Sequence, residues 1–205
     1  MTEHYYAATP VSGHRRNEFV ITVRDVTLNL TTDAGVFSKD RMDNGTRLLI
    51  ESLRLAPDWR RILDLGCGYG PIGLVLARLL PEAVVTMVDV NERAVELARE
   101  NAARNGIENV RIVCGEGFDG QGETRFDLVV TNPPIRAGKE VIYQMVDESS
   151  PHLQSGGWFV AVIMTKHGAK SLEKKMAEVF GNVTEWEKGS GYRVVASRKD
   201  TRQEN

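Results

Sequence analysis

An asparagine followed by two prolines, at positions 132 to 134, is the segment of this chain whose residue types are best suited to chemistry. It comes directly after the apolar run 126–130, which is typical of a buried strand. Because a proline keeps the preceding residue extended, Asn132 cannot begin a helix, and its side chain projects from the carboxyl end of the strand. The two prolines also remove two N–H groups, which leaves carbonyl acceptors beside the carboxamide oxygen. We therefore interpret Asn132 and Pro133 as candidate catalytic residues that hold an amino group; the alternative is an ordinary turn that ends a strand.

A glycine-rich segment, Gly66-Cys67-Gly68-Tyr69-Gly70, is the second candidate. Closely spaced glycines let the backbone turn sharply and pass beside a ligand without obstruction by side chains. Some twenty residues later, Asp89 ends the next apolar run, where a carboxylate can accept hydrogen bonds from both hydroxyls of a ribose. The spacing favours a cofactor that contains a nucleoside.

Two interpretations of this segment compete, because residues 68–73 also match the G-x-G-x-x-G pattern of dinucleotide enzymes. Three features favour S-adenosylmethionine. The first glycine after the strand is Gly66, which gives a different spacing; Asp64 would repel a pyrophosphate but attract a cationic ligand; and the acceptors at Asn132 suit an amine nucleophile. We expect the cofactor to contact Asp64, Gly66, Cys67, Gly68, Gly70, Asp89, Val90, Glu116, Gly117 and Asn132. Glu116 is the candidate acceptor for the adenine amino group; the alternative is a solvated acid in a loop.

Substrate contacts are predicted on the segments around these motifs. Pro134 and Ile135 can pack against a base turned out of its stack, and Phe37 can stack on it or cover it. Basic side chains at strand ends and turns can bind phosphates, namely Arg136, Lys139, Lys166 and Arg193. The alternatives are ordinary packing for the apolar residues and solvated surface charge for the basic ones.

The elements that must position these residues alternate between apolar runs and helical patterns, which indicates parallel strands joined by crossover helices. Strands are predicted at 62–65, 84–89, 110–113, 126–131 and 158–164, and helices at about 43–55, 92–105 and 169–180, with Asn91 as an N-cap. Period-two alternation predicts an antiparallel hairpin at 183–197 that closes the edge of the sheet, and another at 19–30 that turns at Arg24 and Asp25.

Length and composition limit the possible classes of protein. A chain of 205 residues with 41% hydrophobic content can bury one core. The formal charge of −2 argues against binding of nucleic acid by bulk charge, and the two cysteines have no metal-ligand spacing. We expect an extension with a hairpin at 1–40, one catalytic domain at 41–199 and a tail at 200–205. We also expect a cytoplasmic protein with no metal and no membrane segment; the oligomeric state is open.

Taken in order, Asp64-Leu-Gly-Cys-Gly-Tyr-Gly, Asp89 and Asn132-Pro-Pro-Ile resemble the motifs of class I S-adenosylmethionine-dependent methyltransferases. With Gly35-Val-Phe-Ser-Lys-Asp and Gly191-Tyr-Arg-Val, the chain is similar over residues 17–198 to the catalytic domain of bacterial small-subunit ribosomal RNA guanine-N2 methyltransferases. The best-known of these enzymes carry an additional copy of the domain before the catalytic one, so the resemblance is to the shorter, single-domain members.

The resemblance implies an α/β Rossmann-like fold. Its sheet would have seven strands, mostly parallel with an antiparallel last strand, helices on both faces and a small N-terminal hairpin. The implied reaction is methylation of an exocyclic amino nitrogen of an RNA base, with guanine N2 of ribosomal RNA as the first choice and free RNA or a ribosomal particle as the partner. Methylation of a protein glutamine amide or a small molecule, and a non-catalytic cofactor-binding or RNA-binding module, are the alternatives.

Overall fold

A computed structural model describes residues 15–36 and 41–200 of the chain, apart from the side chain of Arg136. The central sheet has seven strands in the order β5-β4-β3-β6-β7-β9-β8. The first five strands of this order, from β5 through β4, β3 and β6 to β7, are parallel to one another. Strand β9 is antiparallel to both of its neighbours, β7 and β8. Their bounds are β3 Arg61–Leu65, β4 Val84–Asp89, β5 Val110–Cys114, β6 Phe126–Thr131, β7 Leu153–Met164, β8 Thr184–Gly189 and β9 Tyr192–Arg198.

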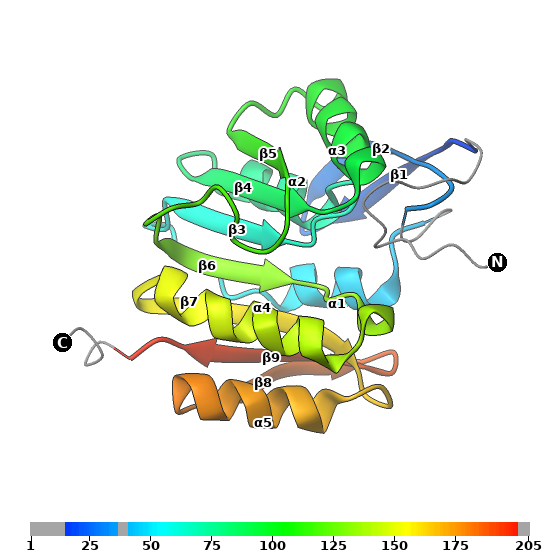
Figure 1. Cartoon of the computed structure of the whole chain (residues 1–205). Helices are drawn as coiled ribbons and strands as arrows, with labels where there is room; N and C mark the ends of the chain where they lie inside the picture. The colour runs from blue at the N-terminus through cyan, green and yellow to red at the C-terminus, as the bar shows by residue number, and fades with distance from the viewer. Residues whose placement is uncertain (1–14, 37–40, 201–205) are drawn as a thin grey trace.

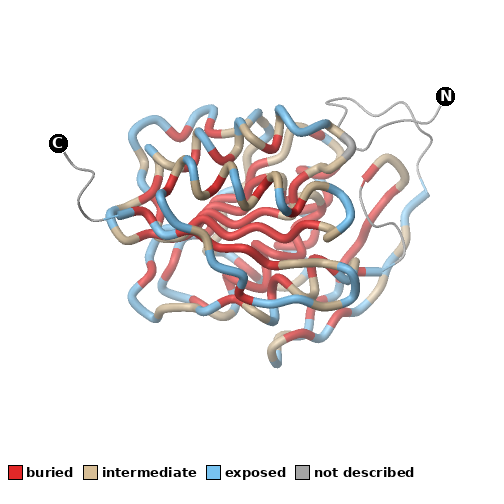
Figure 2. Tube along the Cα trace, turned by 90° about the horizontal axis from the view of Figure 1, so that it is seen from below, coloured by how far each residue is buried: buried red, intermediate tan, exposed pale blue. Residues whose placement is uncertain are grey.

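Helices cover both faces of this sheet (Figure 1). Helices α1 Asn44–Ser52, α2 Pro71–Leu79 and α3 Glu92–Arg104 pack into one hydrophobic core, whereas α4 Lys139–His152 and α5 Ala169–Phe180 pack into the other. Figure 2 shows that buried residues follow the strands through the middle of the molecule, while the helices expose their outer sides. The expected fold class is confirmed: the last strand of the chain, β9, runs opposite to both of its neighbours, β7 and β8.

Most element bounds agree closely with the sequence pattern. Helix α5 begins and ends where predicted, because Gly181 supplies the left-handed residue that ends it. Asn91 caps α3, and its Oδ1 accepts from Ala94 N at 3.2 Å. Strand β7 begins earlier than expected, at Leu153, and α1 ends at Ser52 instead of continuing to Leu55. Helix α4 was not assigned from the sequence; it ends with Pro151 in its last turn.

The N-terminal hairpin forms a separate two-stranded sheet, β1 Asn17–Val23 and β2 Val26–Thr32, that lies against α3. Its turn residues Arg24 and Asp25 both have left-handed backbone angles (φ 48° and 63°), as a two-residue turn between twisted strands requires. Within the described residues, no helix combines the length and the apolar content that crossing a bilayer needs.

Strand order reverses where β4 and β6 lie on opposite sides of β3. The crossover helices diverge at such a point, which leaves a crevice at the carboxyl ends of the strands. The glycine-rich segment follows β3, and Asn132 follows β6. The fold therefore brings the two candidate motifs to the same crevice, although more than sixty residues separate them in the sequence.

Candidate active site

A pocket of about 1490 Å³ opens at this crevice. Ligand pockets usually measure about 300 to 1,000 Å³, so this one has room for a cofactor and a substrate group together. One half is lined by the glycine segment and the ends of β4 and β5; the other is lined by the segment after β6, the start of α1 and residues around the end of β7. We call these the cofactor half and the acceptor half.

The glycine segment forms the floor of the cofactor half. Gly66 N and Cys67 N both donate to Val88 O, at 2.8 and 3.0 Å, which ties the segment to the end of β4. Gly68 has a φ of 57°, and a Cβ placed on it would meet no protein atom within 4 Å. Open space beside a backbone that only glycine adopts easily is the arrangement that lets a ligand approach closely.

The Asp89 carboxylate also binds the backbone of the glycine segment. Its Oδ2 accepts from Gly68 N at 2.8 Å, and its Oδ1 accepts from Asn91 N at 2.9 Å. Burial raises the pKa of Asp89, while these backbone N–H groups oppose the increase. The carboxylate lines the pocket with acceptor capacity left over, as binding of ribose hydroxyls requires.

Asp64, two residues before the glycine segment, is fully buried and is not among the residues that line the pocket. Its Oδ2 accepts from Gly73 N at 2.8 Å, and its Oδ1 has no hydrogen-bond partner among the described residues. Burial raises the pKa of Asp64 to about 7, and the nearby Asp89 carboxylate adds to the effect. A buried acceptor without a donor is costly, and a cationic ligand in the cofactor half would compensate for it by attraction.

The side-chain amide of Asn132 lies in the acceptor half. Its Nδ2 donates to Thr46 Oγ1 at 2.9 Å and lies 3.5 and 3.4 Å from the two carboxylate oxygens of Asp43. Just before it, Thr131 Oγ1 donates to Leu65 O at 2.7 Å, which fixes the end of β6 against β3. In the described part of the chain no hydrogen bond reaches Asn132 Oδ1 or the Pro133 carbonyl oxygen. Two acceptors therefore remain available in this half of the pocket.

The other predicted site residues fall into three groups. Those that line the pocket are Gly66, Cys67, Gly68, Val90, Glu116, Gly117, Pro134, Ile135 and Lys139. Gly70 instead lies outside the pocket lining as the N-cap of α2, where a Cβ would come within 2.9 Å of Met87 Cε. Phe37 and the side chain of Arg136 lie outside the described residues, so their predicted roles remain predictions.

The basic residues that were predicted to bind phosphates differ in whether their side chains are already held by carboxylates. Lys139 and Lys166 are exposed at the pocket. Arg193 is already engaged, because its Nη1 pairs with Glu173 at 3.1 Å and with Glu185 at 3.2 Å. An arginine held by two carboxylates is a poor phosphate ligand, so these ion pairs argue against the predicted role of Arg193.

Sequence reasoning missed the acceptor-half residues that come from distant parts of the chain. Asp43 and Thr46 belong to the start of α1, and Tyr192 begins β9. A Cβ on Gly45 would lie 2.6 Å from Tyr192 Cε1, so glycine is what allows the Tyr192 ring to contact the first turn of α1. Burial raises the pKa of Tyr192, and the Asp43 carboxylate adds to this. The sequence signals a helix cap at Asp43 but contains no sign of its long-range partners.

Other features of the described residues are not suited to this chemistry. Burial raises the pKa of the Cys67 thiol well above its ordinary value, so the thiol stays protonated. No three His, Cys, Asp or Glu side chains converge as metal ligands in the described ranges.

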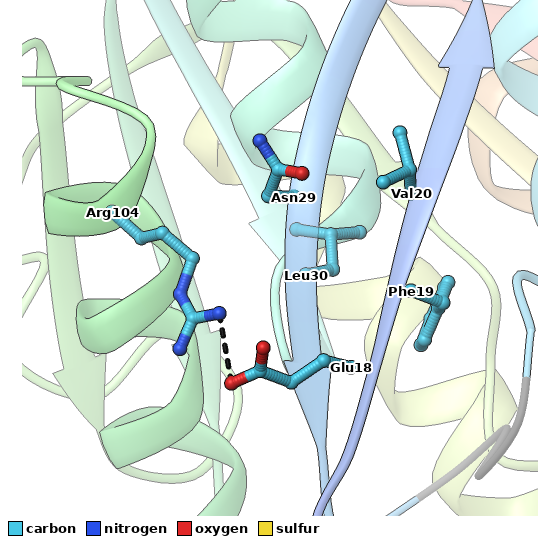
Figure 3. Close-up of a pocket in the computed structure, with 6 residues that line it drawn as sticks. All are labelled: Glu18, Phe19, Val20, Asn29, Leu30 and Arg104. Atoms are coloured by element: carbon cyan, nitrogen blue, oxygen red, sulfur yellow. Dashed lines mark ion pairs between the residues drawn. The ribbon is translucent and has the colours of Figure 1, made fainter.

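A smaller pocket of about 320 Å³ lies between the hairpin and α3, where Arg104 and Glu18 pair at 2.9 Å (Figure 3). Asn132 and the glycine segment are not among its lining residues.

Several known proteins are similar to this chain in sequence or in fold. Residues 27–196 match the model of the methyltransferase small domain. The uncharacterized protein YbxB of Bacillus subtilis is 42% identical over 200 residues, which cover 97% of this chain and 100% of that protein. The ribosomal RNA small subunit methyltransferase C of Pseudomonas putida (strain GB-1) is 38% identical over 143 residues, which cover 68% of this chain and 42% of the relative.

Among solved structures, the T. thermophilus 16S rRNA N2 G1207 methyltransferase (RsmC), in complex with AdoMet and guanosine, superimposes with a TM-score of 0.82 and 28% identity. The match covers 93% of this chain and 52% of that one. The chain thus spans about half the length of the methyltransferases named here.

Proposed function

The chain belongs to the methyltransferase small domain family, and on this premise we propose that it methylates an exocyclic amino nitrogen of an RNA base, with guanine N2 of ribosomal RNA as the target. Its cofactor is S-adenosylmethionine. The single observation that carries the proposal is the state of the Asn132 amide, whose NH₂ group is bound to the protein while its oxygen is left for a ligand.

The cofactor half has the groups that S-adenosylmethionine needs. Gly66 and Gly68 provide backbone without side chains, and Asp89 provides an acceptor for ribose hydroxyls. The buried Asp64 carboxylate, with its unpartnered Oδ1, favours a cationic amino acid portion above it. When bound, the cofactor supplies a methyl group that is already activated as a sulfonium.

The acceptor half then has to orient the target nitrogen. Asn132 Oδ1 and the Pro133 carbonyl oxygen accept its two N–H bonds, so that the nitrogen lone pair faces the methyl group. Alignment of two reacting groups can reduce a barrier by about 7 to 11 kcal/mol. Because positive charge grows on the nitrogen during transfer, both acceptors stabilise the transition state more than the ground state.

Substrate identity rests on two supports. The relatives named as small subunit methyltransferase C act, by their names, on ribosomal RNA, and the RsmC complex contains guanosine beside the cofactor. In this chain, Lys139 and Lys166 lie at the pocket, where they can bind the phosphates on either side of a base turned out of its stack.

The test is to incubate the protein with a labelled methyl donor and ribosomal RNA from cells that lack its gene, and then to map the labelled base. We expect label on the amino group of one guanine. RNA from wild-type cells, which already carries the methyl group, is the control and should accept little label. Label on a ring nitrogen, a ribose or a ribosomal protein would contradict the proposed target.

A further inference from the structure

The side-chain amide of Asn132 could serve its proposed role in only one of its two orientations. The oxygen and the NH₂ group of a carboxamide have nearly the same size, so packing alone distinguishes the orientations poorly. If the amide were reversed, its NH₂ group would face the N–H bonds of the target, and two donors would meet. Some neighbouring group must therefore decide which end of the amide faces the pocket.

The start of α1 provides such a group in Asp43 and a further partner in Thr46, although they lie 86 to 89 residues away in the sequence. The Thr46 hydroxyl can accept or donate, so the Asp43 carboxylate is the group that distinguishes the two ends of the amide. Thr46 Oγ1 accepts from Asn132 Nδ2 at 2.9 Å, and both Asp43 carboxylate oxygens lie within 3.5 Å of the same nitrogen. An ionised carboxylate only accepts hydrogen bonds, so it pairs with the NH₂ end of the amide and repels the oxygen end.

The Asp43 carboxylate is itself fixed in place. As the N-cap of α1, its Oδ1 accepts from Gly45 N at 2.9 Å and from Thr46 N at 3.1 Å. These two hydrogen bonds tie the carboxylate to the exposed N–H groups of the first turn of α1. They therefore hold its oxygens beside Asn132 in a fixed geometry.

We propose that Asp43 and Thr46 are positioning residues for methyl transfer, which hold the Asn132 amide with its oxygen toward the substrate. We call this pair the amide clamp. The inference rests on the proposed function, because it concerns how the acceptor for the target amine is oriented. It adds a second role to residues that would otherwise be described only as a helix cap and its neighbour.

The deciding variant is Asp43→Asn. Asparagine caps helices about as well as aspartate does, so α1 should be retained. Its own NH₂ group, however, can donate to the Asn132 oxygen and so favours the reversed amide. We expect turnover to fall about tenfold or more, with cofactor affinity and melting temperature close to wild type.

Thr46 provides a matched pair. Thr46→Val keeps the shape but removes the acceptor, and we expect reduced turnover; Thr46→Ser keeps the hydroxyl and should restore most of it. The double variant Asp43→Asn with Asn132→Ala should be no slower than Asn132→Ala alone, because the clamp acts only through Asn132. Additive losses, or wild-type turnover in a folded Asp43→Asn protein, would overturn the proposal.

A measurement without substrate separates this inference from the proposed function. In protein labelled with ¹⁵N at asparagine, the Asn132 side-chain NH₂ resonances should exchange slowly and should shift in Asp43→Asn more than in Asp25→Asn, a control in the hairpin turn. If RNA proves not to be the substrate, this result still supports the clamp. If the Asn132 resonances are the same in Asp43→Asn as in wild type, the clamp is wrong whatever the substrate.

Discussion

At the scale of single residues, the site works through groups whose hydrogen-bonding capacity is only partly used. Asn132 commits its two N–H bonds to the protein and keeps an acceptor, while Asp64 keeps a buried acceptor. Unpartnered acceptors reduce the stability of the ligand-free protein, and a donor that arrives with a ligand compensates for them. The observed arrangement thus favours binding of cationic and amino groups.

Replacing Asn132 by alanine tests its role as an acceptor. We expect turnover to fall about 10² to 10³-fold, as losses of a single transition-state hydrogen bond do, while cofactor affinity changes little. Single-turnover methylation and equilibrium binding measure the two quantities separately. Wild-type turnover in this variant would refute the role.

The buried Asp64 predicts how stability depends on pH. Its folded pKa of about 7 exceeds the ordinary value of 3.8, so the folded protein binds this proton more tightly than the unfolded chain does. The contribution to stability is complete below the ordinary value and is lost as pH rises toward 7. Between about pH 5 and about pH 8, wild type should lose about 2 to 3 kcal/mol more unfolding free energy than Asp64→Asn does.

Urea denaturation of the cofactor-free protein at the two pH values measures this difference. Asp119→Asn, which changes an exposed carboxyl, is the control and should follow wild type. Parallel pH profiles for wild type and Asp64→Asn would show that the carboxyl is not held in a desolvated site.

At the scale of elements, Asn101 connects three of them. It is fully buried on α3; its Oδ1 accepts from Thr31 N at 2.7 Å, and its Nδ2 donates to Thr31 O and to Tyr69 O, both at 2.9 Å. One amide thus joins the hairpin and the glycine segment to α3. The hairpin, which alternation alone predicts as a simple extension, supports the floor of the cofactor half through this residue.

Replacing Asn101 by alanine should leave the Thr31 backbone groups buried without partners. Each such group costs about 1 to 3 kcal/mol, so we expect the unfolding free energy to fall by about 3 kcal/mol and cofactor affinity to fall with it. Asn105→Ala is the matched control, since the Asn105 side-chain amide pairs with Asn29 N and O in the same way but makes no hydrogen bond to the glycine segment. Equal losses of affinity in both variants would argue against a specific effect on the glycine segment.

Prediction from sequence succeeded where the signal is local. Period-two alternation, the cap at Asn91 and the glycine at 181 determine strands and helix ends through neighbouring residues, and these elements lie where expected. It failed for contacts between distant segments. Nothing near Asp43 indicates that it meets Asn132, because that contact exists only once the sheet has formed. Gly70, which was predicted to contact the cofactor, is the N-cap of α2 and is not among the residues that line the pocket, so its contact with the cofactor stays a prediction.

At the scale of the whole molecule, the charge distribution bears on how RNA would bind. A net charge of −2 provides no general attraction, so RNA would have to bind through a local group of basic side chains, and Lys139 and Lys166 are the lysines that line the pocket. Each phosphate contact on a single strand makes the slope of log affinity against log salt more negative by about 0.7. We expect RNA affinity to fall with salt at a slope near −1.4 if these two lysines are the main contacts.

Replacing Lys166 by alanine should make this slope less steep, by about 0.7, and should lower the affinity for RNA at low salt. Lys174→Ala removes an exposed lysine of α5 that is not among the pocket residues, and it should leave the slope unchanged. Filter binding across a salt series measures both. A slope near zero in wild type would point to an uncharged small molecule as the substrate.

The contact between Gly45 and Tyr192 has a consequence for biosynthesis. The first helix of the described fold, α1, packs on β7, β8 and β9, so the acceptor half joins an early segment of the chain to the last strand. The strands that hold the cofactor, by contrast, are complete by residue 114. During translation the strands of the cofactor half therefore emerge well before β9, whereas the acceptor half is complete only after β9 has been made.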